Sequence, residues 1–345
     1  MLREGALIRA FTDLTGQDVA LTRLHNSIMN DRVHHAMLFC GPDGVGKFLA
    51  AQHLAQILVC QNPQSGSACN ECSACYKCHH SNHPDIVYLE PNEKGKITVD
   101  EIREANQVLY IQPLEAPFKV MIIRDADSMN PQAQNALLKT LEEPPGQSKI
   151  ILTSAKPQAF LGTILSRCQR VDFKPVPLGN IQKILQAKTD LDEASAHLVA
   201  ALAQGSPAQA LSADPEEIMQ RRDYVAEIDR KLNTRERRQA ATAIEVATEL
   251  SGDKEELSAR LQLLGVWIRD QILFASQADM NTVANIDRHN DLQFLANERG
   301  LPQLLQRAKF IEEAQFKLSQ PFNLNVGLIV EQLCLSLVGL NGSIR

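Results

Sequence analysis

A short glycine-rich stretch carries the clearest chemistry in this chain. Gly41-Pro42-Asp43-Gly44-Val45-Gly46-Lys47-Phe48 fits the phosphate-binding pattern G-x-x-x-x-G-K-[ST] at every position except the last. An apolar run precedes it and a helical pattern follows, which is the context that the motif needs. Glycines let backbone N–H groups curl around a phosphate, and a helix N-terminus adds partial positive charge. We therefore expect a nucleotide-binding loop formed by Gly41, Gly44, Gly46, Lys47 and Phe48.

Two positions depart from a working ATPase. A Ser or Thr hydroxyl normally ligates magnesium where this chain has Phe48, which has no oxygen. The buried strand expected at 118–123 should deliver an Asp to magnesium and often a Glu that polarises water. Arg124 and Asp125 stand at those places, and an arginine cannot ligate a metal. Of nucleotide binding and ATP hydrolysis, hydrolysis should be impaired the most, because it depends on the metal. The alternative interpretation is that Asp125 and Asp127 cap the following helix.

Five of the eight cysteines fall between residues 60 and 78. In a reducing compartment such a cluster indicates a metal site rather than disulfides. Four thiolates suit tetrahedral zinc and leave no open position for a substrate, so we expect a structural zinc, with an iron–sulfur cluster as the lesser alternative. The favoured ligands are Cys60, Cys69, Cys72 and Cys75. A rival set replaces Cys60 by Cys78. His79, His80 and His83 are further ligand candidates, although we expect them to be solvated loop residues.

Composition and charge limit the function further. The chain of 345 residues has a net charge of −6, so bulk attraction to a polyanion such as DNA is excluded and any such contact must be local or shared with partners. Only 5% of residues are aromatic, with one Trp, which favours helix-rich packing on aliphatic side chains. The sequence shows no long apolar run and no signal-peptide pattern, so we expect a cytoplasmic protein.

Apolar runs alternate with helical patterns over the first half of the chain. Strands are expected at 36–40, 118–123 and 148–154. Residues 83–89 are expected to run from a loop into a second strand, and residues 164–173 lead into a fifth. This alternation predicts a parallel sheet in a three-layered α/β domain. A hydroxyl of Thr153 or Ser154, at the end of the fourth strand, is a candidate sensor of a γ-phosphate. From about residue 215 onward the pattern predicts helices only.

Three features together resemble a known family. They are the stretch Asn135-Ala-Leu-Leu-Lys-Thr-Leu-Glu-Glu-Pro-Pro145, the tripeptide Ser166-Arg167-Cys168, and a four-cysteine insertion directly after the phosphate-loop helix. The chain is similar to the clamp-loader subunits of bacterial DNA polymerase III, in the AAA+ group. This resemblance implies a P-loop AAA+ domain at 1–174 with a zinc insertion at about 60–80, a helical lid at 175–214, and a helical collar at 215–345.

Within this family, a tau/gamma motor subunit hydrolyses ATP and a stator subunit supports it. The motor has an arginine where this chain aligns Ala208, a third lost catalytic position. The resemblance therefore implies a stator in a hetero-oligomeric ring with tau/gamma and delta, within a DNA-directed DNA polymerase holoenzyme. It also implies contact with the sliding clamp and primer–template DNA through the complex. Arg167 would act as an arginine finger in trans, and ATP or ADP would bind weakly or without hydrolysis.

Two alternatives stay open at this point. One is an active ATPase motor subunit of the tau/gamma type that tolerates Phe48. The other is a zinc-dependent DNA-binding module with a relic P-loop, against which the acidic net charge argues.

Overall fold

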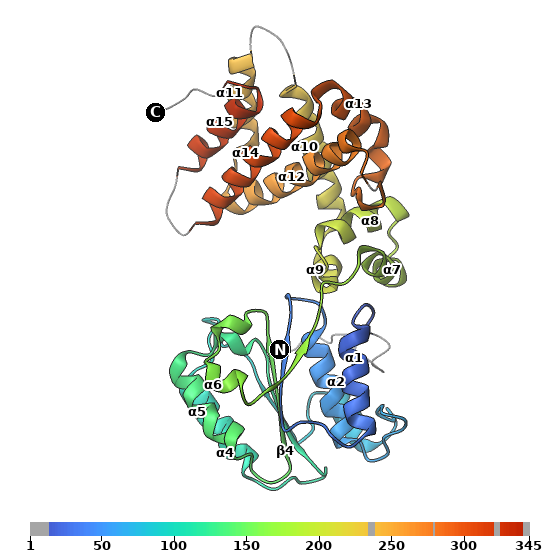
Figure 1. Ribbon diagram of the computed structural model, residues 1–345, viewed down its shortest axis with the longest axis vertical. Coiled ribbons are helices and arrows are strands. Elements are labelled where there is room, and N and C mark those ends of the chain that lie inside the picture. Colours follow the sequence, from blue (N-terminus) through green and yellow to red (C-terminus); the bar gives the residue numbers. More distant parts are fainter. Residues whose placement is uncertain (1–13, 234–238, 279, 321–324, 341–345) are drawn as a thin grey trace. The chain divides into compact units, whose positions relative to one another are not determined.

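The computed structural model describes residues 14–233, 239–278, 280–320 and 325–340. The chain forms two compact units. One takes the chain up to residue 181 together with 205–209, and the other takes 182–204 and the chain from 210 onward. The first is α/β and the second is helical (Figure 1). The predicted fold class, a parallel-sheet P-loop domain followed by an all-helical C-terminal part, is confirmed. The division into three domains stays a prediction.

Five parallel strands form the sheet of the first unit, in the order β2-β3-β4-β1-β5. Each lies at or inside the range expected from the sequence. The strand that precedes the glycine loop lies inside the sheet, because β1 pairs with β4 on one side and β5 on the other. The bounds of the five strands are β1 Ala36–Cys40, β2 Ile86–Leu89, β3 Lys119–Ile123, β4 Ser148–Ser154 and β5 Gln169–Asp172.

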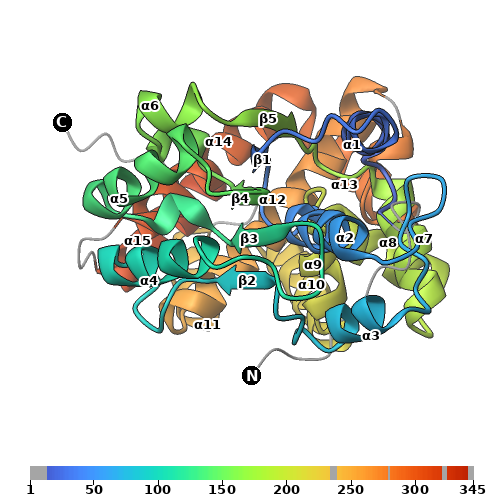
Figure 2. The same ribbon diagram turned by 90° about the horizontal axis from the view of Figure 1, so that it is seen from below.

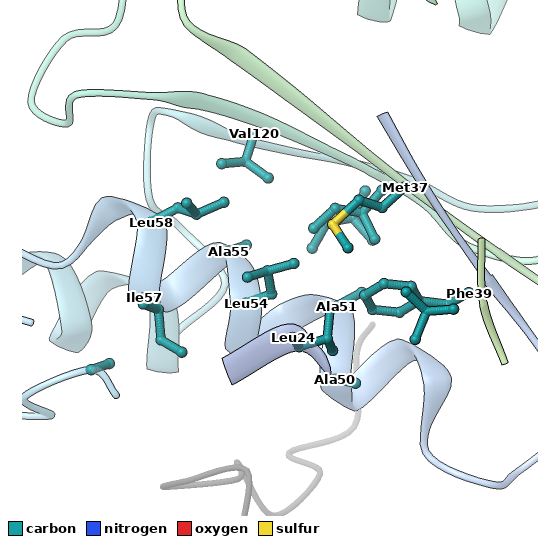
Figure 3. Packing of buried hydrophobic residues seen from close by; sticks show 14 of the residues in the cluster. Leu24, Met37, Phe39, Ala50, Ala51, Leu54, Ala55, Ile57, Leu58 and Val120 are labelled. Atoms are coloured by element: carbon teal, nitrogen blue, oxygen red, sulfur yellow. The ribbon is translucent and has the colours of Figure 1, made fainter. Parts of the chain in front are cut away.

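Alternate residues of each strand point to opposite faces of the sheet, and helices cover both faces. Met37 and Phe39 of β1 join the core beneath α1 and α2, as Figure 3 shows, whereas Ala36 and Leu38 join the core beneath α4 and α5. Figure 2 shows these two helix pairs on either side of the sheet. A strand buried on both faces needs a continuous apolar run, which is the pattern that the sequence has.

Local signals set the helix starts of this unit. Thr98 and Glu101 form a capping box on α4, in which the Glu101 carboxylate accepts from the Thr98 N–H at 2.6 Å. Asn130 caps α5, where a Pro occupies the first turn. The helices of this part of the chain are α1 Asp18–Met29, α2 Lys47–Val59, α3 Ser73–His79, α4 Val99–Leu109, α5 Pro131–Glu142 and α6 Gly162–Leu165, with 3-10 turns at Ala126–Ser128 (η2) and Pro157–Ala159 (η3).

Packed helices build the second unit. Its core includes Trp267, Leu264 and Ile268 of the long helix α12. None of the described helices is long and apolar enough to cross a membrane. The remaining helices are α7 Leu178–Lys188, α8 Glu193–Leu202, α9 Pro207–Ser212, α10 Pro215–Lys231, α11 Gln239–Leu250, α12 Lys254–Ser276, η4 Met280–Thr282, η5 Ile286–Arg288, α13 His289–Arg299, α14 Leu301–Ser319 and α15 Val326–Leu337.

A buried charge cluster lies inside this helical core. The Asp229 carboxylate accepts hydrogen bonds from Arg307 at 2.6 Å and from Arg299 at 2.7 Å, and also from the Trp267 indole and the Gln271 amide. All of these side chains are buried. Two guanidiniums thus face one carboxylate, and Arg307 also donates to the Leu337 carbonyl at the end of α15. This C-terminal carbonyl carries partial negative charge and offsets part of the excess positive charge.

Candidate phosphate loop and metal centre

The glycine loop lies at the carboxyl end of β1 and leads directly into α2. In open parallel sheets, ligands bind at this edge. Gly46 has a φ of +101°, and a side chain there would place its Cβ 2.6 Å from Leu14 Cδ2. Gly44 has a φ of +73°, and a Cβ there would meet the Ser206 hydroxyl. Glycine is thus required both for the backbone turn and for the close approach of neighbouring segments.

Lys47 is folded into this loop. Its ammonium donates to the carbonyl oxygens of Gly41 and Pro42, each at 2.6 Å, and lies 3.7 Å from the Asp43 carboxylate. The side chain is only 6% exposed. Burial lowers the pKa of Lys47, and the charge of Asp43 opposes that shift. A bound phosphate would have to replace the two carbonyl oxygens as the partner of this ammonium.

The two departures from the ATPase pattern contact each other. The guanidinium carbon of Arg124 lies 5.0 Å from the centroid of the Phe48 ring, within the range of a cation–π interaction. Tyr88 meets the same ring edge-on at 6.4 Å. An aromatic ring and a permanent cation therefore stand where a magnesium site needs two oxygen ligands. These residues do not fit a magnesium ion.

Acidic neighbours hold the Arg124 guanidinium in place. Glu90, directly after β2, and Asp125 each lie 3.5 Å from it. Glu90 was not among the site residues predicted from the sequence. No local signal marks it, because its closeness to Arg124 follows from the pairing of β2 with β3, in the register Leu89 opposite Ile123.

Asp125 stands at the N-cap position of η2, but its side chain makes no capping hydrogen bond there, so that interpretation of the sequence is wrong. It adopts φ +45° and ψ +49°, and its own backbone N–H donates to the Thr153 hydroxyl at 3.1 Å. Asn130 supplies the cap of α5, and the Asp127 carboxylate accepts from the Ala155 N–H at 3.3 Å. Burial raises the pKa of the Asp125 carboxyl group, whereas the charge of Arg124 opposes the shift.

Both hydroxyls of the proposed sensor are buried at the carboxyl end of β4. Thr153 accepts the N–H of Asp125, and Ser154 accepts the N–H of Lys156 at 2.9 Å. The first bond ties the turn after β3 to the end of β4, and the second lies within the turn after β4. A role for either hydroxyl in sensing phosphate stays a prediction.

A distant segment covers part of the loop. The Ala208 N–H donates to the Gly44 carbonyl at 3.2 Å, and the Ser206 hydroxyl accepts from the Gln209 N–H at 3.3 Å. Ala208 therefore contacts the phosphate loop through its backbone, at the position that the family resemblance aligned with the arginine of the motor.

Arg167 lies just after α6, and its side chain is 36% exposed. Its guanidinium pairs with the Glu142 carboxylate at 2.7 Å and donates to the Thr163 carbonyl at 3.0 Å. Glu142 is the last residue of α5, within the stretch that carried the family resemblance. The guanidinium thus has an intrachain partner at the surface, and a role as a finger in trans stays a prediction.

Four cysteines converge beside α3. The Sγ atoms of Cys60, Cys69, Cys72 and Cys75 all lie within 4.8 Å of one another. Four of the sulfur–sulfur distances are 3.5, 3.7, 3.9 and 4.0 Å. A tetrahedral ion with metal–sulfur bonds of about 2.3 Å needs sulfurs about 3.8 Å apart. This set of thiols can hold a metal ion.

Backbone geometry supports these four as the ligand group. The N–H groups of Cys69 and Cys75 donate to the sulfurs of Cys60 and Cys72, at 3.3 and 3.4 Å. Burial raises the pKa of the Cys72 thiol, but hydrogen bonds, first from the Cys75 N–H, outweigh this and lower it to about 6, so its thiolate forms readily. Cys78 is buried outside this group.

His83 does not lie in solvent, so that expectation is wrong. Its side chain is buried, and its Nδ1 accepts the Asp85 N–H at 3.1 Å. The residue starts the turn into β2, in which the Ile86 N–H donates to the His83 carbonyl at 3.1 Å.

The sequence matches family models along most of its length. Residues 16–177 match the model described as DNA polymerase III, delta subunit, and residues 216–338 match the model of its C-terminal part. The delta' subunit of DNA polymerase III from Pseudomonas aeruginosa is 31% identical over 89% of this chain and 93% of its own length. The chain belongs to the family of DNA polymerase III delta' subunits.

Two other relatives in sequence match a smaller part of the chain. The tau subunit from Bacillus subtilis is 34% identical over 59% of this chain, and the match spans only 36% of the tau subunit. The delta' subunit from Escherichia coli is 33% identical over 55% of this chain. A solved gamma subunit-related protein from Thermotoga maritima aligns over 91% of this chain with a TM-score of 0.41 and 16% identity.

Proposed function

We propose that this chain is the stator of a bacterial clamp loader, which helps to place the sliding clamp on primed DNA and does not hydrolyse ATP itself. Its partners are then the tau/gamma and delta subunits in a cytoplasmic hetero-oligomeric ring, with the clamp and primer–template DNA contacted through the complex. Membership of the delta' family supports the role in DNA polymerase III. The observation that carries the absence of hydrolysis is the contact between Arg124 and Phe48.

This contact removes the electrostatic basis of phosphoryl transfer. Hydrolysis of a triphosphate relies on a metal that bridges the β- and γ-oxygens and neutralises developing charge. Phe48 offers no oxygen ligand, and the fixed positive charge of Arg124 repels a divalent cation at the same place. The loop keeps the geometry of a phosphate cradle, but its surroundings do not support the chemistry.

We assign Arg167 a role in ATP hydrolysis by an adjacent motor subunit. A guanidinium is permanently charged and matches phosphate oxygens in geometry. Its partner Glu142 is 48% exposed, and an ion pair at such a surface is worth little. Arg167 can therefore exchange Glu142 for the γ-phosphate in the ATP site of an adjacent motor subunit, where it stabilises the transition state.

The test is DNA-stimulated ATP hydrolysis by the reconstituted complex with Arg167→Ala. Loss of a finger lowers the rate of the affected site by roughly 10³-fold. Arg170→Ala is the matched control, because Arg170 is an exposed arginine three positions away that pairs with Asp172 at 2.6 Å. Size-exclusion chromatography verifies that both variants assemble. An unchanged rate in the assembled Arg167→Ala complex contradicts the finger assignment, and rapid hydrolysis by the isolated wild-type chain contradicts the stator.

We also propose that the four-cysteine group holds a structural zinc. Four sulfurs at tetrahedral spacing leave no position for a substrate. The group links the end of α2 to α3, so a bound ion would fix the insertion against the α/β unit.

A further inference from the structure

Charge balance at the phosphate loop differs from that of a magnesium-dependent site. A nucleotide brings several negative charges, which a lysine and a divalent cation together usually neutralise. In this chain Lys47 lies in the loop and Arg124 lies over Phe48, the next residue of α2. Two protein cations therefore flank the start of this helix, where phosphates bind.

The Arg124 guanidinium is held in position before any ligand arrives. It stacks on Phe48 at 5.0 Å and pairs with Glu90 and Asp125 at 3.5 Å each. The side chain is 43% exposed, so part of the guanidinium faces outward. Both ion pairs are longer than a charge-assisted hydrogen bond, which is about 2.7–2.9 Å. The N–H donors of Arg124 are thus incompletely used by these carboxylates.

We propose that the loop binds a nucleoside di- or triphosphate without magnesium, and that Arg124 takes over the neutralising role of the metal. This inference deepens the proposed function, since it assigns a ligand to a loop that no longer supports hydrolysis. Lys47 exchanges the carbonyl oxygens of Gly41 and Pro42 for phosphate oxygens, and Arg124 donates to the phosphate oxygens on the Phe48 side. The bound nucleotide then acts as a structural ligand of the α/β unit.

The test is fluorescence titration of the full-length chain with mant-ADP and mant-ATP, in EDTA and in excess magnesium. We expect binding in EDTA to be at least as tight as in magnesium. Arg124→Gln should weaken binding in EDTA by about tenfold or more, since a hydrogen bond to a charged group is worth roughly 1.5–3 kcal/mol. Arg124→Lys, which keeps the charge, should retain binding independent of magnesium.

Two controls separate this effect from a loss of folding. Arg103→Gln changes an exposed arginine of α4 that pairs with Asp100, and it should leave binding unchanged. The double variant Phe48→Thr, Arg124→Asp restores both oxygen ligands, and its binding should become dependent on magnesium. Circular dichroism and Tm establish that each variant is folded.

Three results would overturn the inference: no nucleotide binding by the wild-type chain, binding only in magnesium, or unchanged binding by Arg124→Gln. These results are distinguishable from failure of the proposed function. If no nucleotide binds while Arg167→Ala still slows the complex, the stator stands and this inference fails. If nucleotide binds in EDTA while Arg167→Ala has no effect, the finger assignment fails and this inference stands.

Discussion

The backbone N–H of Ala208 donates to the carbonyl oxygen of Gly44 at 3.2 Å, so a segment 164 positions further along the chain covers the phosphate loop. Ser206 also lies close to Gly44, because a Cβ on Gly44 would meet the Ser206 hydroxyl. The loop is thus part of a packed interface within the α/β unit, and its glycine is required by a neighbour as well as by its own backbone.

This contact makes Gly44→Ala destabilising. A non-glycine residue at φ +73° is strained by roughly 1–2 kcal/mol, and the added methyl group overlaps Ser206, which adds about 1–3 kcal/mol. Urea unfolding should show the loss. Ser206→Ala in the same chain should recover part of it by removing the hydroxyl. Failure of Ser206→Ala to recover any stability contradicts the close approach of the two segments.

The pair of Arg124 and Phe48 should be measurable as a coupling free energy. A double-mutant cycle with Phe48→Leu and Arg124→Gln should give an interaction of about 0.5–1 kcal/mol in the free energy of unfolding, since the guanidinium is partly exposed. The pair Arg103 and Asp100 on α4 serves as an exposed reference, with coupling near the lower end of surface values. Independent effects of the two substitutions would exclude the stacked geometry.

Metal analysis distinguishes the two cysteine sets. Cys60→Ser should reduce zinc in the purified protein from about one per chain to a small fraction, and should lower Tm, because structural zinc contributes directly to folding. Cys78→Ser is the matched control: this thiol is buried but lies outside the four-sulfur group, so zinc content should persist. Loss of zinc in Cys78→Ser but not in Cys60→Ser would reverse the assignment.

The buried carboxylate of Asp229 should contribute more to the free energy of unfolding than any surface acid of the second unit. Asp229→Asn leaves Arg299 and Arg307 without their counter-charge, and breaking such a buried pair destabilises by about 3–5 kcal/mol. Asp223→Asn tests the same helix at a half-exposed position, where the loss should stay below about 1 kcal/mol. Equal losses measured by urea unfolding would contradict the buried cluster.

Low pH should remove the stability that the ionised Asp229 carboxylate contributes to the folded chain. Burial raises the pKa of Asp229, but the charges of Arg307 and Arg299 outweigh burial and lower it below its ordinary value. A lowered folded-state pKa gives stability that is present above the unfolded value, about 3.9, and lost as pH falls through the folded value. The wild-type chain should therefore lose more unfolding free energy below about pH 4 than Asp229→Asn does. Parallel pH profiles would exclude this linkage.

The sequence by itself determined the features that depend on neighbours along the chain. The glycine pattern at 41–48, the cysteine spacing and the capping box at Thr98 are local, because a turn or a helix start is set by residues a few positions apart. Strand positions were also predictable, since burial on both faces leaves a continuous apolar run.

Tertiary structure decided the contacts between residues far apart in the sequence. Strand order brings Glu90 beside Arg124, and packing of α2 brings Phe48 beneath the same guanidinium. Residues 205–209 return to the α/β unit and place Ser206 against Gly44, and packing in the helical core brings Asp229 to Arg307. Residue types and local spacing encode none of these distances, because they depend on which elements pack together. The lost magnesium ligands, and Arg124 at the place of one of them, were visible in the sequence, but the contact between Arg124 and Phe48 was not.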